Sequence, residues 1–355
     1  MKKVLIVLQH LDVGGIESTI LNICSHIDTS LYKVEIFCCD SQFMGKEKEF
    51  EKYKIYKAPY INSFKNIIAF EKILTNVLSS EKYDVVHSNM GIFDALVLKV
   101  AYKCKVSIRI SHGHFRASQW GDKWYKQIIV HIARIIFKTM IKIYATACIA
   151  CSKEANEYCF DGKGRVIYNG IDFEQYENCK GVHQGGPRVK LITVGRMSYA
   201  KNPLFIVDII NELVKIRQDI VFFWIGTGGM KKDIENRINN FGLKEYFEIL
   251  GVRNDVSRIL KENDYFLLPS LAEGLSMALL EAQVSGLDCF ASDNVPADVN
   301  CGKVKFLPIG DAKLWAEEIN KHISQEKWCI DNEKLSRFDI KYTIKQIEQV
   351  YDGRL

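Results

Sequence analysis

The chain has 355 residues, of which 48% are hydrophobic and 26% charged, and it carries a formal net charge of +5. This composition excludes a disordered chain, and the length is sufficient for two domains with a hydrophobic core each. The eleven cysteines form no tight spacing framework, which favours a reducing compartment over a disulfide scaffold.

The first predicted element is a buried strand within the N-terminal segment MKKVLIVLQHLD. Two lysines precede it, as in a signal peptide, but its apolar run covers only five residues before Gln9 and His10. No stretch in the chain approaches the about 18 uninterrupted apolar residues of a membrane span. We therefore expect no transmembrane segment.

Strand-like and helical runs alternate along the rest of the chain. The strand-like runs of the first half are KVLIVLQ, KVEIFCC, YDVVHS, VSIRISH, CIACS and RVIYNG. The second half restarts the rhythm with RVKLITVG, IVFFWIG, FEILG, YFLLPS and DCFASD. Strands that alternate with helices form doubly wound parallel sheets, so we expect an α/β protein with two Rossmann-like domains that face each other across a cleft.

A cluster of glycines indicates the boundary between these domains. The segment NCKGVHQGGPR contains three glycines and a proline, which is typical of a linker. The predicted parts are an N-terminal domain at residues 1–172, a hinge at 173–186, a C-terminal domain at 187–337 and a C-terminal helix at 338–355 that crosses back to the first domain. Ligands of such sheets bind beyond the carboxyl ends of the strands, which places the expected site in the cleft.

Positive charge is concentrated in the first half. Residues 1–172 contain 24 basic and 17 acidic side chains, and between Ala101 and Lys153 there are ten basic residues and one acid. An amphipathic helix is predicted in this window, with a polar and basic stripe formed by Lys123, Gln127, His131, Arg134, Lys138 and Lys142. The stripe is typical of a helix on an anionic membrane surface, or of a core-facing helix with a solvated face. Nucleic acid is a weaker choice, because no recognised motif accompanies the charge.

Two cysteines, Cys148 and Cys151, form a CxxC motif inside the strand-like run ATACIACS. No second cysteine pair or histidine lies nearby at zinc spacing, so we interpret both as core residues.

The segment EGLSMALLE places two acids, Glu273 and Glu281, eight positions apart. If one helix contained both, a period of about 3.6 residues would put them on one face. The preceding YFLLPS reads as a buried strand stopped by a proline, so a loop and a helix start are expected here. Backbone amides at Gly274, Leu275 and Ser276 would then be available to an anion. The alternative is an acid favoured by the helix dipole followed by an unrelated exposed acid.

Two cations follow the predicted strand LITVG. The segment GRMSYAKNP places Arg196 and Lys201 at a strand-to-helix turn. Either cation alone is typical of a solvated surface charge. Together, and beside free helix amides, they suit a diphosphate.

With these motifs the chain resembles the retaining GT-B glycosyltransferases of type 4, especially the members of that family in bacterial exopolysaccharide and capsule synthesis. The resemblance extends over nearly the whole chain. The motifs that carry it are LDVGGIEST, RISHGH, VIYNGID, GRMSYAKNP, GTGG, EILGVRNDV, PSLAEGLSMALLEA and SDNVP. The two glutamates after PS are a specific signal of this family, whereas each glycine turn by itself is a weak signal. Tyr168 departs from the family pattern, which has proline at that position.

The resemblance implies a role for each candidate residue in the second half. Glu281 would bind the ribose hydroxyls of a nucleotide, and Glu273 the hydroxyls of the donor sugar. Arg196 and Lys201 would bind the diphosphate, together with the amides of residues 274–276.

The remaining implied contacts come from other loops. The loop of Gly14 and Gly15 would close over the diphosphate from the first domain, and the backbone at Val252 and Arg253 would border the base.

A histidine at the end of RISHGH would face the sugar, and here we favour His112 over His114 because it lies nearer the strand end. A lone histidine at such a place is more often a structural hydrogen-bonding group. His112, Arg196, Lys201 and Glu273 are thus the catalytic candidates. No metal site is visible in the sequence, and we expect no metal or cofactor, since the cations and amides would neutralise the leaving group.

We therefore expect a cytoplasmic glycosyltransferase that uses a nucleotide-diphosphate sugar, with a UDP-sugar favoured, in exopolysaccharide or capsule biosynthesis. A polyprenyl-diphosphate-linked glycan is the hypothesised acceptor, since the basic helix would suit work at the inner face of the plasma membrane. One alternative is a nucleotide-sugar 2-epimerase, which shares the two-domain fold. Another is a non-catalytic nucleotide-sugar-binding partner of a transferase, which the intact charged residues disfavour.

Overall fold

The computed structural model describes residues 1–11, 15–40, 47–114, 124–177, 187–325 and 327–354, and for residues 40, 47, 48, 124–133 and 177 it describes the backbone alone. The chain divides into two compact units. Unit 1 comprises Met1–Gly170 together with Ile340–Leu355, and unit 2 comprises Ile171–Asp339. Residues 173–177, expected in the hinge, form helix α7 (Phe173–Glu177) within unit 2. The rest of the expected hinge, 178–186, lies outside the described residues.

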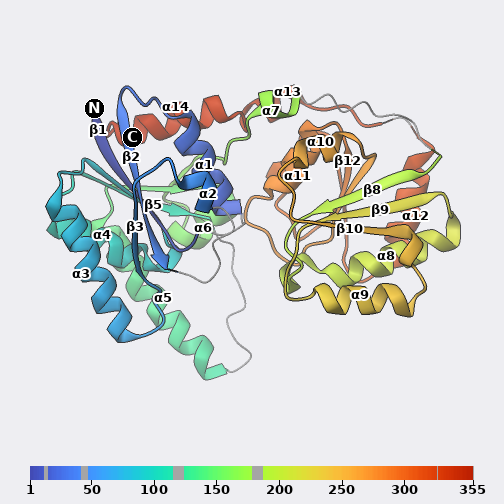
Figure 1. The fold of residues 1–355 in the computed structure, drawn as a ribbon, viewed down its shortest axis with the longest axis horizontal. Coiled ribbons are helices and arrows are strands. Elements are labelled where there is room, and N and C mark those ends of the chain that lie inside the picture. Colours follow the sequence, from blue (N-terminus) through green and yellow to red (C-terminus); the bar gives the residue numbers. More distant parts are fainter. Residues whose placement is uncertain (12–14, 41–46, 115–123, 178–186, 326, 355) are drawn as a thin grey trace. The chain divides into compact units, whose positions relative to one another are not determined.

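Unit 1 is built on a seven-stranded parallel sheet, visible edge-on at the centre of that unit in Figure 1. Its strand order is β3-β2-β1-β4-β5-β6-β7, so the order reverses between β1 and β4. The strands are β1 (Lys2–Leu8), β2 (Tyr32–Asp40), β3 (Ile55–Pro59), β4 (Val85–Asn89), β5 (Ile108–Gly113), β6 (Ala147–Ala150) and β7 (Arg165–Val166). The central strands β1, from Val4 on, and β4 are buried throughout because helices cover both of their faces.

Two hydrophobic cores lie on opposite faces of this sheet. Alternate residues of β1 enter each core: Val4 and Ile6 lie in one, Leu5 and Val7 in the other. The helices of the unit are α1 (Gly15–His26), α2 (Glu47–Phe50), α3 (Phe64–Ser80), η1 (Gly91–Phe93), α4 (Asp94–Lys103), α5 (Trp124–Tyr144), α6 (Lys153–Phe160) and α14 (Ile340–Tyr351).

The last helix, α14, belongs to unit 1 although the whole of unit 2 separates it in sequence. Its buried residues Ile340, Ile344, Ile347 and Tyr351 recur at steps of three and four and form one apolar face. That face completes the core that α1 covers, and Figure 1 shows the red α14 beside the blue α1. A Cβ on Gly170 would lie 2.6 Å from the Cα of Ile340, so the close approach of the two segments requires glycine there.

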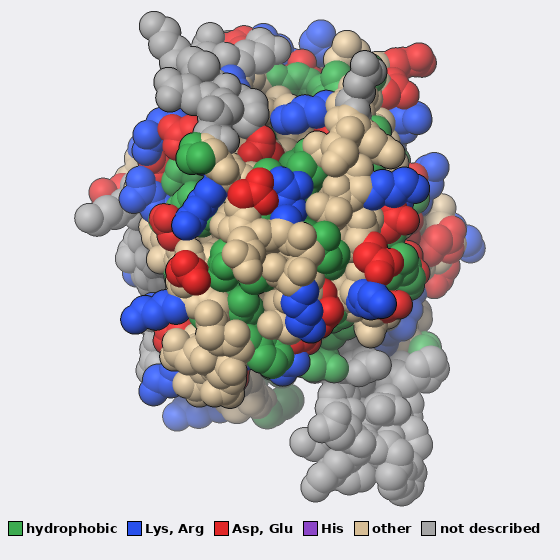
Figure 2. Space-filling view, turned by 90° about the vertical axis from the view of Figure 1, so that its right-hand side faces the viewer, with side chains coloured by type: hydrophobic (Ala, Val, Ile, Leu, Met, Phe, Trp, Pro, Cys, Tyr) green, Lys and Arg blue, Asp and Glu red, His purple; other side chains and the backbone are tan. Residues whose placement is uncertain are grey.

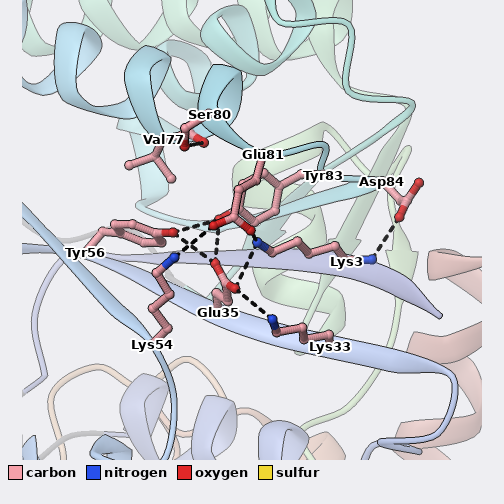
Figure 3. A network of polar contacts seen from close by, with 10 residues as sticks. All are labelled: Lys3, Lys33, Glu35, Lys54, Tyr56, Val77, Ser80, Glu81, Tyr83 and Asp84. Atoms are coloured by element: carbon pink, nitrogen blue, oxygen red, sulfur yellow. Dashed lines mark hydrogen bonds and ion pairs between the residues drawn. The ribbon is translucent and has the colours of Figure 1, made fainter.

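A charged network occupies the amino ends of β1 and β2 (Figure 3). Glu35 is 1% exposed, accepts a hydrogen bond of 2.6 Å from Tyr83, and lies 2.9 Å from Nζ of Lys3. Burial raises the pKa of Glu35, but hydrogen bonds from Tyr83 and Lys3 outweigh it and hold that pKa below its usual range. The network lies at the edge opposite the carboxyl ends of the strands, so we assign it to the stability of the sheet.

Unit 2 contains a six-stranded parallel sheet with the order β10-β9-β8-β11-β12-β13. The order reverses between β8 and β11. The strands are β8 (Val189–Val194), β9 (Ile220–Ile225), β10 (Phe247–Gly251), β11 (Tyr265–Leu268), β12 (Asp288–Ser292) and β13 (Val304–Leu307). The prediction of two doubly wound parallel sheets is therefore confirmed.

Helices cover this second sheet as well. The sequence of α8 (Pro203–Ile216) illustrates the features that favour a helix. Pro203 occupies the first helical position, where no amide hydrogen is needed, and Phe205, Ile209 and Leu213 face the core. The other helices are η2 (Tyr199–Lys201), α9 (Lys231–Asn240), η3 (Lys244–Tyr246), α10 (Val256–Lys261), α11 (Met277–Val284), η4 (Ala297–Val299), α12 (Ala312–Ile323) and α13 (Asn332–Ser336). The face shown in Figure 2 carries acidic and basic side chains intermixed, as expected of a solvated surface.

A buried acid, Asp288, stands at the amino end of β12. Its two oxygens contact Nζ of Lys303 at 2.7 Å and Nε2 of His322 at 2.8 Å. The imidazole of His322 stacks on Trp328, with ring centroids 3.9 Å apart. Asp288 therefore joins β12, α12 and the segment after α12 in one polar cluster inside the core.

In the described part of α5, the basic side chains of the predicted stripe have partners within unit 1. Lys138 and Lys142 both contact Asp161, at 2.7 and 3.1 Å, and Arg134 donates to the carbonyl of Tyr158. The two lysines hold the pKa of Asp161 at about 2. These three predicted stripe residues therefore lie on a helix as expected, and Asp161 offsets one of their three positive charges. The predicted stripe residues 123–131 lie outside the described side chains.

Candidate functional site

Four loops of unit 2 meet at the carboxyl edge of its sheet. Hydrogen bonds between their backbones connect them: Gly195 to Ile225 at 2.9 Å, Gly226 to Gly251 at 2.7 Å, and Leu271 to Ala200 at 2.8 Å. The loops follow β8, β9, β10 and β11, so they surround the point where the strand order reverses. Ligands of open α/β sheets bind at such a point.

The GTGG turn can approach the loop after β8 only because it contains glycine. A Cβ on Gly226 would lie 2.1 Å from the carbonyl oxygen of Gly195, and one on Gly228 would lie 2.4 Å from that of Met197. Gly226 also has a φ of +133°, which other residues rarely adopt. These glycines hold the rim of the site in place.

Lys201 and Glu273 meet at this edge. Nζ of Lys201 lies 2.5 Å from Oε1 of Glu273, and the hydroxyl of Ser270 donates to the same oxygen at 2.6 Å. Their side chains are 25% and 10% exposed, so solvent or a ligand can reach the pair. The stem of Lys201 lies against Gly195, where a Cβ would be 3.5 Å from it. The structure thus brings together two of the predicted catalytic residues.

Arg196 lies two residues after the end of β8 and is exposed. Among the residues that the structure describes, none pairs with its guanidinium. A cation without a partner at the reversal point is available to an anion.

Glu281 lies in α11 and is half-buried, whereas Glu273 precedes the first helical residue by four positions. The condition that one helix contains both acids is therefore not met, whereas the expected loop followed by a helix start is present. Ser276 is the N-terminal cap residue, and the loop that begins at Pro269 delays the helix until Met277. The loop, not helical periodicity, sets the position of Glu273.

The predicted anion-binding amides, at residues 274–276, lie at the end of the loop and at the N-terminal cap of α11. Ser276 makes no capping hydrogen bond, and its buried hydroxyl has no partner in the described structure. Leu275 is buried, while Gly274 is half-buried. The amides in the first turn of α11 itself have no partners within the helix, as at any helix start.

The segment after β10 is arranged differently for its two predicted residues. Val252 is 54% exposed. The guanidinium of Arg253 donates two hydrogen bonds of 2.8 Å to Asp255. The backbone of both residues stays the predicted contact of a base.

In unit 1, the corresponding edge carries the glycine loop and the histidines. Gly15 is the first residue of α1, and a Cβ there would meet nothing within 4 Å. Gly14 lies outside the described residues.

His112 and His114 stand at the carboxyl end of β5, both buried, with ring centroids 3.9 Å apart. Nε2 of His114 contacts the side-chain oxygen of Asn89 at 2.8 Å, and Nε2 of His112 has no partner among the described residues.

Some neighbours of these residues escaped the sequence analysis. His87 on β4 contacts His112, and Asp94 accepts hydrogen bonds of 2.5 Å from both Ser88 and Ser111, which joins the ends of β4 and β5. A histidine inside the apolar run YDVVHS was the available signal. Ser270, directly before the acidic loop, was another.

Two negative findings concern the described residues alone. No group of three or more histidine, cysteine or acidic side chains there could hold a metal ion. No helix among them is long and apolar enough to cross a bilayer. Cys148 and Cys151 form no disulfide, and burial raises the pKa of Cys148 to about 12.

Two parallel α/β units with loops at the strand-order reversal define the GT-B class of glycosyltransferases. The chain matches the family described as Glycosyltransferase Family 4 over residues 13–175 and that described as Glycosyl transferases group 1 over residues 188–325. It belongs to the family 4 glycosyltransferases and is related to members of bacterial exopolysaccharide and capsule synthesis.

Individual proteins show the same relationship. The putative glycosyltransferase EpsF of Bacillus subtilis is 24% identical over 90% of this chain and 87% of its own. An Escherichia coli UDP-Gal:alpha-D-GlcNAc-diphosphoundecaprenol alpha-1,3-galactosyltransferase is 31% identical over 66% of this chain and 62% of its own. The crystal structure of Anabaena HepE in complex with UDP superposes with a TM-score of 0.80 at 17% identity, over 99% of this chain and all of that one.

Proposed function

We propose that this chain is a retaining glycosyltransferase that transfers a sugar from a UDP-sugar to a polyprenyl-diphosphate-linked glycan in exopolysaccharide or capsule biosynthesis. Its assignment as a glycosyltransferase that uses nucleotide sugars rests on the family. The observation that carries the finer proposal is the contact between Lys201 and Glu273 at the strand-order reversal of unit 2, in the loop that leads into α11 and Glu281.

The donor assignment is supported by chemistry and by the relatives. Arg196 and Lys201 provide two positive charges where a diphosphate would lie, and charged hydrogen bonds to phosphate contribute about 1.5–3 kcal/mol each. HepE has been solved with UDP and with UDP-glucose, and the Escherichia coli relative is named for UDP-galactose. We therefore propose UDP as the nucleotide, with Glu281 binding its ribose and Glu273 the sugar.

In the proposed reaction the bond between the anomeric carbon and the diphosphate breaks, and a bond from the acceptor oxygen to that carbon forms on the same face. The acceptor's proton passes to the leaving diphosphate. Lys201, Arg196 and the amides of α11 stabilise the negative charge that develops there. The proposal includes no metal ion, since these groups neutralise the diphosphate.

Nucleotide binding tests the donor assignment. UDP is expected to raise the melting temperature of the protein more than GDP or ADP, because a ligand that binds only the folded state stabilises it. In Glu281→Ala the Kd for UDP is expected to rise about 10- to 100-fold, the loss of hydrogen bonds to a charged group. The wild type should also prefer UDP over 2′-deoxy-UDP, and the variant should not.

Glu317→Ala, on the exposed side of α12, is the matched control and should leave the Kd unchanged. Equal affinity of the wild type for UDP and 2′-deoxy-UDP would contradict the role of Glu281. Labelled donor that yields a free epimer without a glycosylated lipid would contradict transfer itself.

The acceptor assignment rests on the relatives and on α5. The name of the Escherichia coli relative specifies a diphosphoundecaprenol-linked acceptor. On α5, Ile136 and Ile143 are 54% and 63% exposed and lie seven residues apart, hence on one face. We propose that this apolar face, with nearby basic residues, docks at the inner surface of the plasma membrane from the cytoplasm.

Vesicle flotation tests that docking. The protein is expected to float with vesicles that contain anionic lipid at low salt, and the double variant Ile136→Ser, Ile143→Ser should lose most of the bound fraction. Burying each isoleucine contributes about 1.5–3 kcal/mol, so removal of both has a large effect. Ile216→Ser, an exposed isoleucine at the end of α8, is the control. Failure of the wild type to float would end the membrane part of the proposal and leave the donor part intact.

A further inference from the structure

Three side chains form a continuous hydrogen-bonded chain through the interior of unit 1. Nδ1 of His87 lies 2.8 Å from the hydroxyl of Tyr351, and Nε2 of His87 lies 3.1 Å from Nδ1 of His112. All three side chains are buried. This series of hydrogen bonds starts at Tyr351 on the C-terminal helix α14, passes through His87 on β4 and ends at His112 on β5. Nε2 of His112 has no partner among the described residues.

The two imidazoles in this chain are neutral. Burial lowers the pKa of His87 to about 3 and that of His112 well below its usual value. His114, whose pKa burial lowers to about 3, adjoins them and is neutral too. Each neutral ring carries a single N–H, so one nitrogen donates and the other accepts.

These conditions allow only two arrangements of the protons. In the outward arrangement, Tyr351 donates to His87, His87 donates to His112, and the hydrogen of His112 is on Nε2. In the inward arrangement, every bond is reversed: His112 donates to His87, His87 donates to Tyr351, and Nε2 of His112 is a bare acceptor.

The surroundings of Tyr351 select between them. Its hydroxyl is fully buried in the core that α1 and α14 share, and His87 is its only hydrogen-bond partner in the described structure. The inward arrangement leaves the phenolic hydrogen without an acceptor and Nε2 of His112 without a donor. The outward arrangement leaves one group unpaired, the N–H of His112 at the carboxyl end of the sheet. Since each unpaired buried polar group is costly, the outward arrangement is favoured.

We propose that Tyr351 and His87 are positioning residues that hold His112 in the tautomer with its hydrogen on Nε2, so that it donates a hydrogen bond to an oxygen of the ligand. Under the proposed function, on which this last point rests, the oxygen belongs to the donor sugar. Helix α14, which carries Tyr351, thereby sets the proton position on His112 through two hydrogen bonds, without contacting the ligand.

The tautomer can be observed without any substrate. Long-range ¹H–¹⁵N correlation spectra of histidine-labelled protein at pH 7 distinguish a protonated from a bare ring nitrogen, and the spectrum of His112→Gln identifies the signals of His112. The wild type is expected to show the Nε2–H form. Tyr351→Phe removes the hydroxyl that donates to His87 and should convert His112 to a mixture of both tautomers. We expect kcat to fall about five- to tenfold, because this factor corresponds to the loss of one hydrogen bond.

Tyr32→Phe is the matched control. Its ring packs edge-on against Tyr351, with centroids 5.6 Å apart, and its hydroxyl bonds to Asp352 instead of to a histidine. It should leave both the spectrum and kcat unchanged. His87→Phe, which removes the middle of the chain, should reproduce the effect of Tyr351→Phe on His112.

The inference is overturned if wild-type His112 carries its hydrogen on Nδ1, or if Tyr351→Phe folds and leaves the spectrum unaltered. If neither variant folds, the wild-type spectrum decides alone. A protein that shows the expected tautomers but transfers no sugar would refute the proposed function and leave the proton arrangement standing.

Discussion

Replacing Lys201 with methionine is expected to lower kcat for sugar transfer about 100- to 1,000-fold, the usual effect of removing one group that stabilises charge in a transition state. Methionine keeps the apolar stem that packs against Gly195 and removes only the ammonium group. The variant also leaves the carboxylate of Glu273 without its cation, and that negative charge then opposes the departing diphosphate. Both effects act on the leaving group.

The measurement is the rate of transfer from a labelled UDP-sugar at saturating donor, with the Kd for UDP determined in parallel. Because the charge on the diphosphate grows in the transition state, kcat should fall much further than affinity, which we expect to change by no more than about tenfold. Lys215→Met is the matched control, since Lys215 lies at the end of α8 and contacts only Glu212. A folded Lys201→Met enzyme that retains a tenth of the wild-type rate would contradict the role assigned to Lys201.

The second large effect is expected on stability. Asp288→Ala should lower the free energy of unfolding of unit 2 by about 3–5 kcal/mol, because removing one partner of a buried ion pair leaves an uncompensated charge. Nζ of Lys303 and Nε2 of His322 both lose their acceptor, and neither is exposed enough to exchange it for water.

Denaturation in urea, followed by tryptophan fluorescence, measures this change. Trp224 and Trp315 are buried in the core of unit 2 and report on its unfolding. Asp293→Ala, an exposed acid just beyond the carboxyl end of the same strand, is the control. The double variant Asp288→Ala, Lys303→Met should recover part of the loss, since it removes the unpaired charge as well. Equal midpoints for Asp288→Ala and Asp293→Ala would show that the cluster contributes nothing.

The two predictions assign different roles to two charged groups of unit 2: Lys201 acts in the reaction, and Asp288 stabilises the fold. Lys201 stands at the carboxyl edge of the sheet, where loops replace regular structure and charged groups remain accessible. Asp288 stands at the amino edge, where helices and strands bury the same kinds of group completely. In a parallel sheet all strands end at the same edge, so the difference in exposure follows from topology.

Much of the candidate site was evident in the amino-acid sequence because its residues are close together along the chain. Arg196 and Lys201 lie in one strand-to-helix connection, and Glu273 and Glu281 lie in another loop and the helix that follows it. The apolar strand before each turn predicted that both turns lie at a carboxyl edge, and the reversal of strand order at β8 and β11 brings Lys201 and Glu273 into contact. Local pattern and topology agree here.

Where the sequence analysis was incomplete, the missing information concerns contacts between separate segments and the exact ends of elements. A loop and a helix start were expected around Glu273 and Glu281, but the pattern did not show that the helix begins only after Ser276. The basic stripe was predicted from spacing alone, and only the structure shows that Lys138 and Lys142 both pair with Asp161, about twenty residues further along.

The sequence by itself determined the fold class, the two-sheet organisation and the residues at the strand ends, because periodicity and turn composition are local properties. The return of the last helix to the first domain was predicted as well. Only the tertiary structure showed that Tyr351 on this helix reaches His112 through His87. A residue 264 positions from His87 leaves no trace of that contact in any local pattern, since packing alone brings the two together.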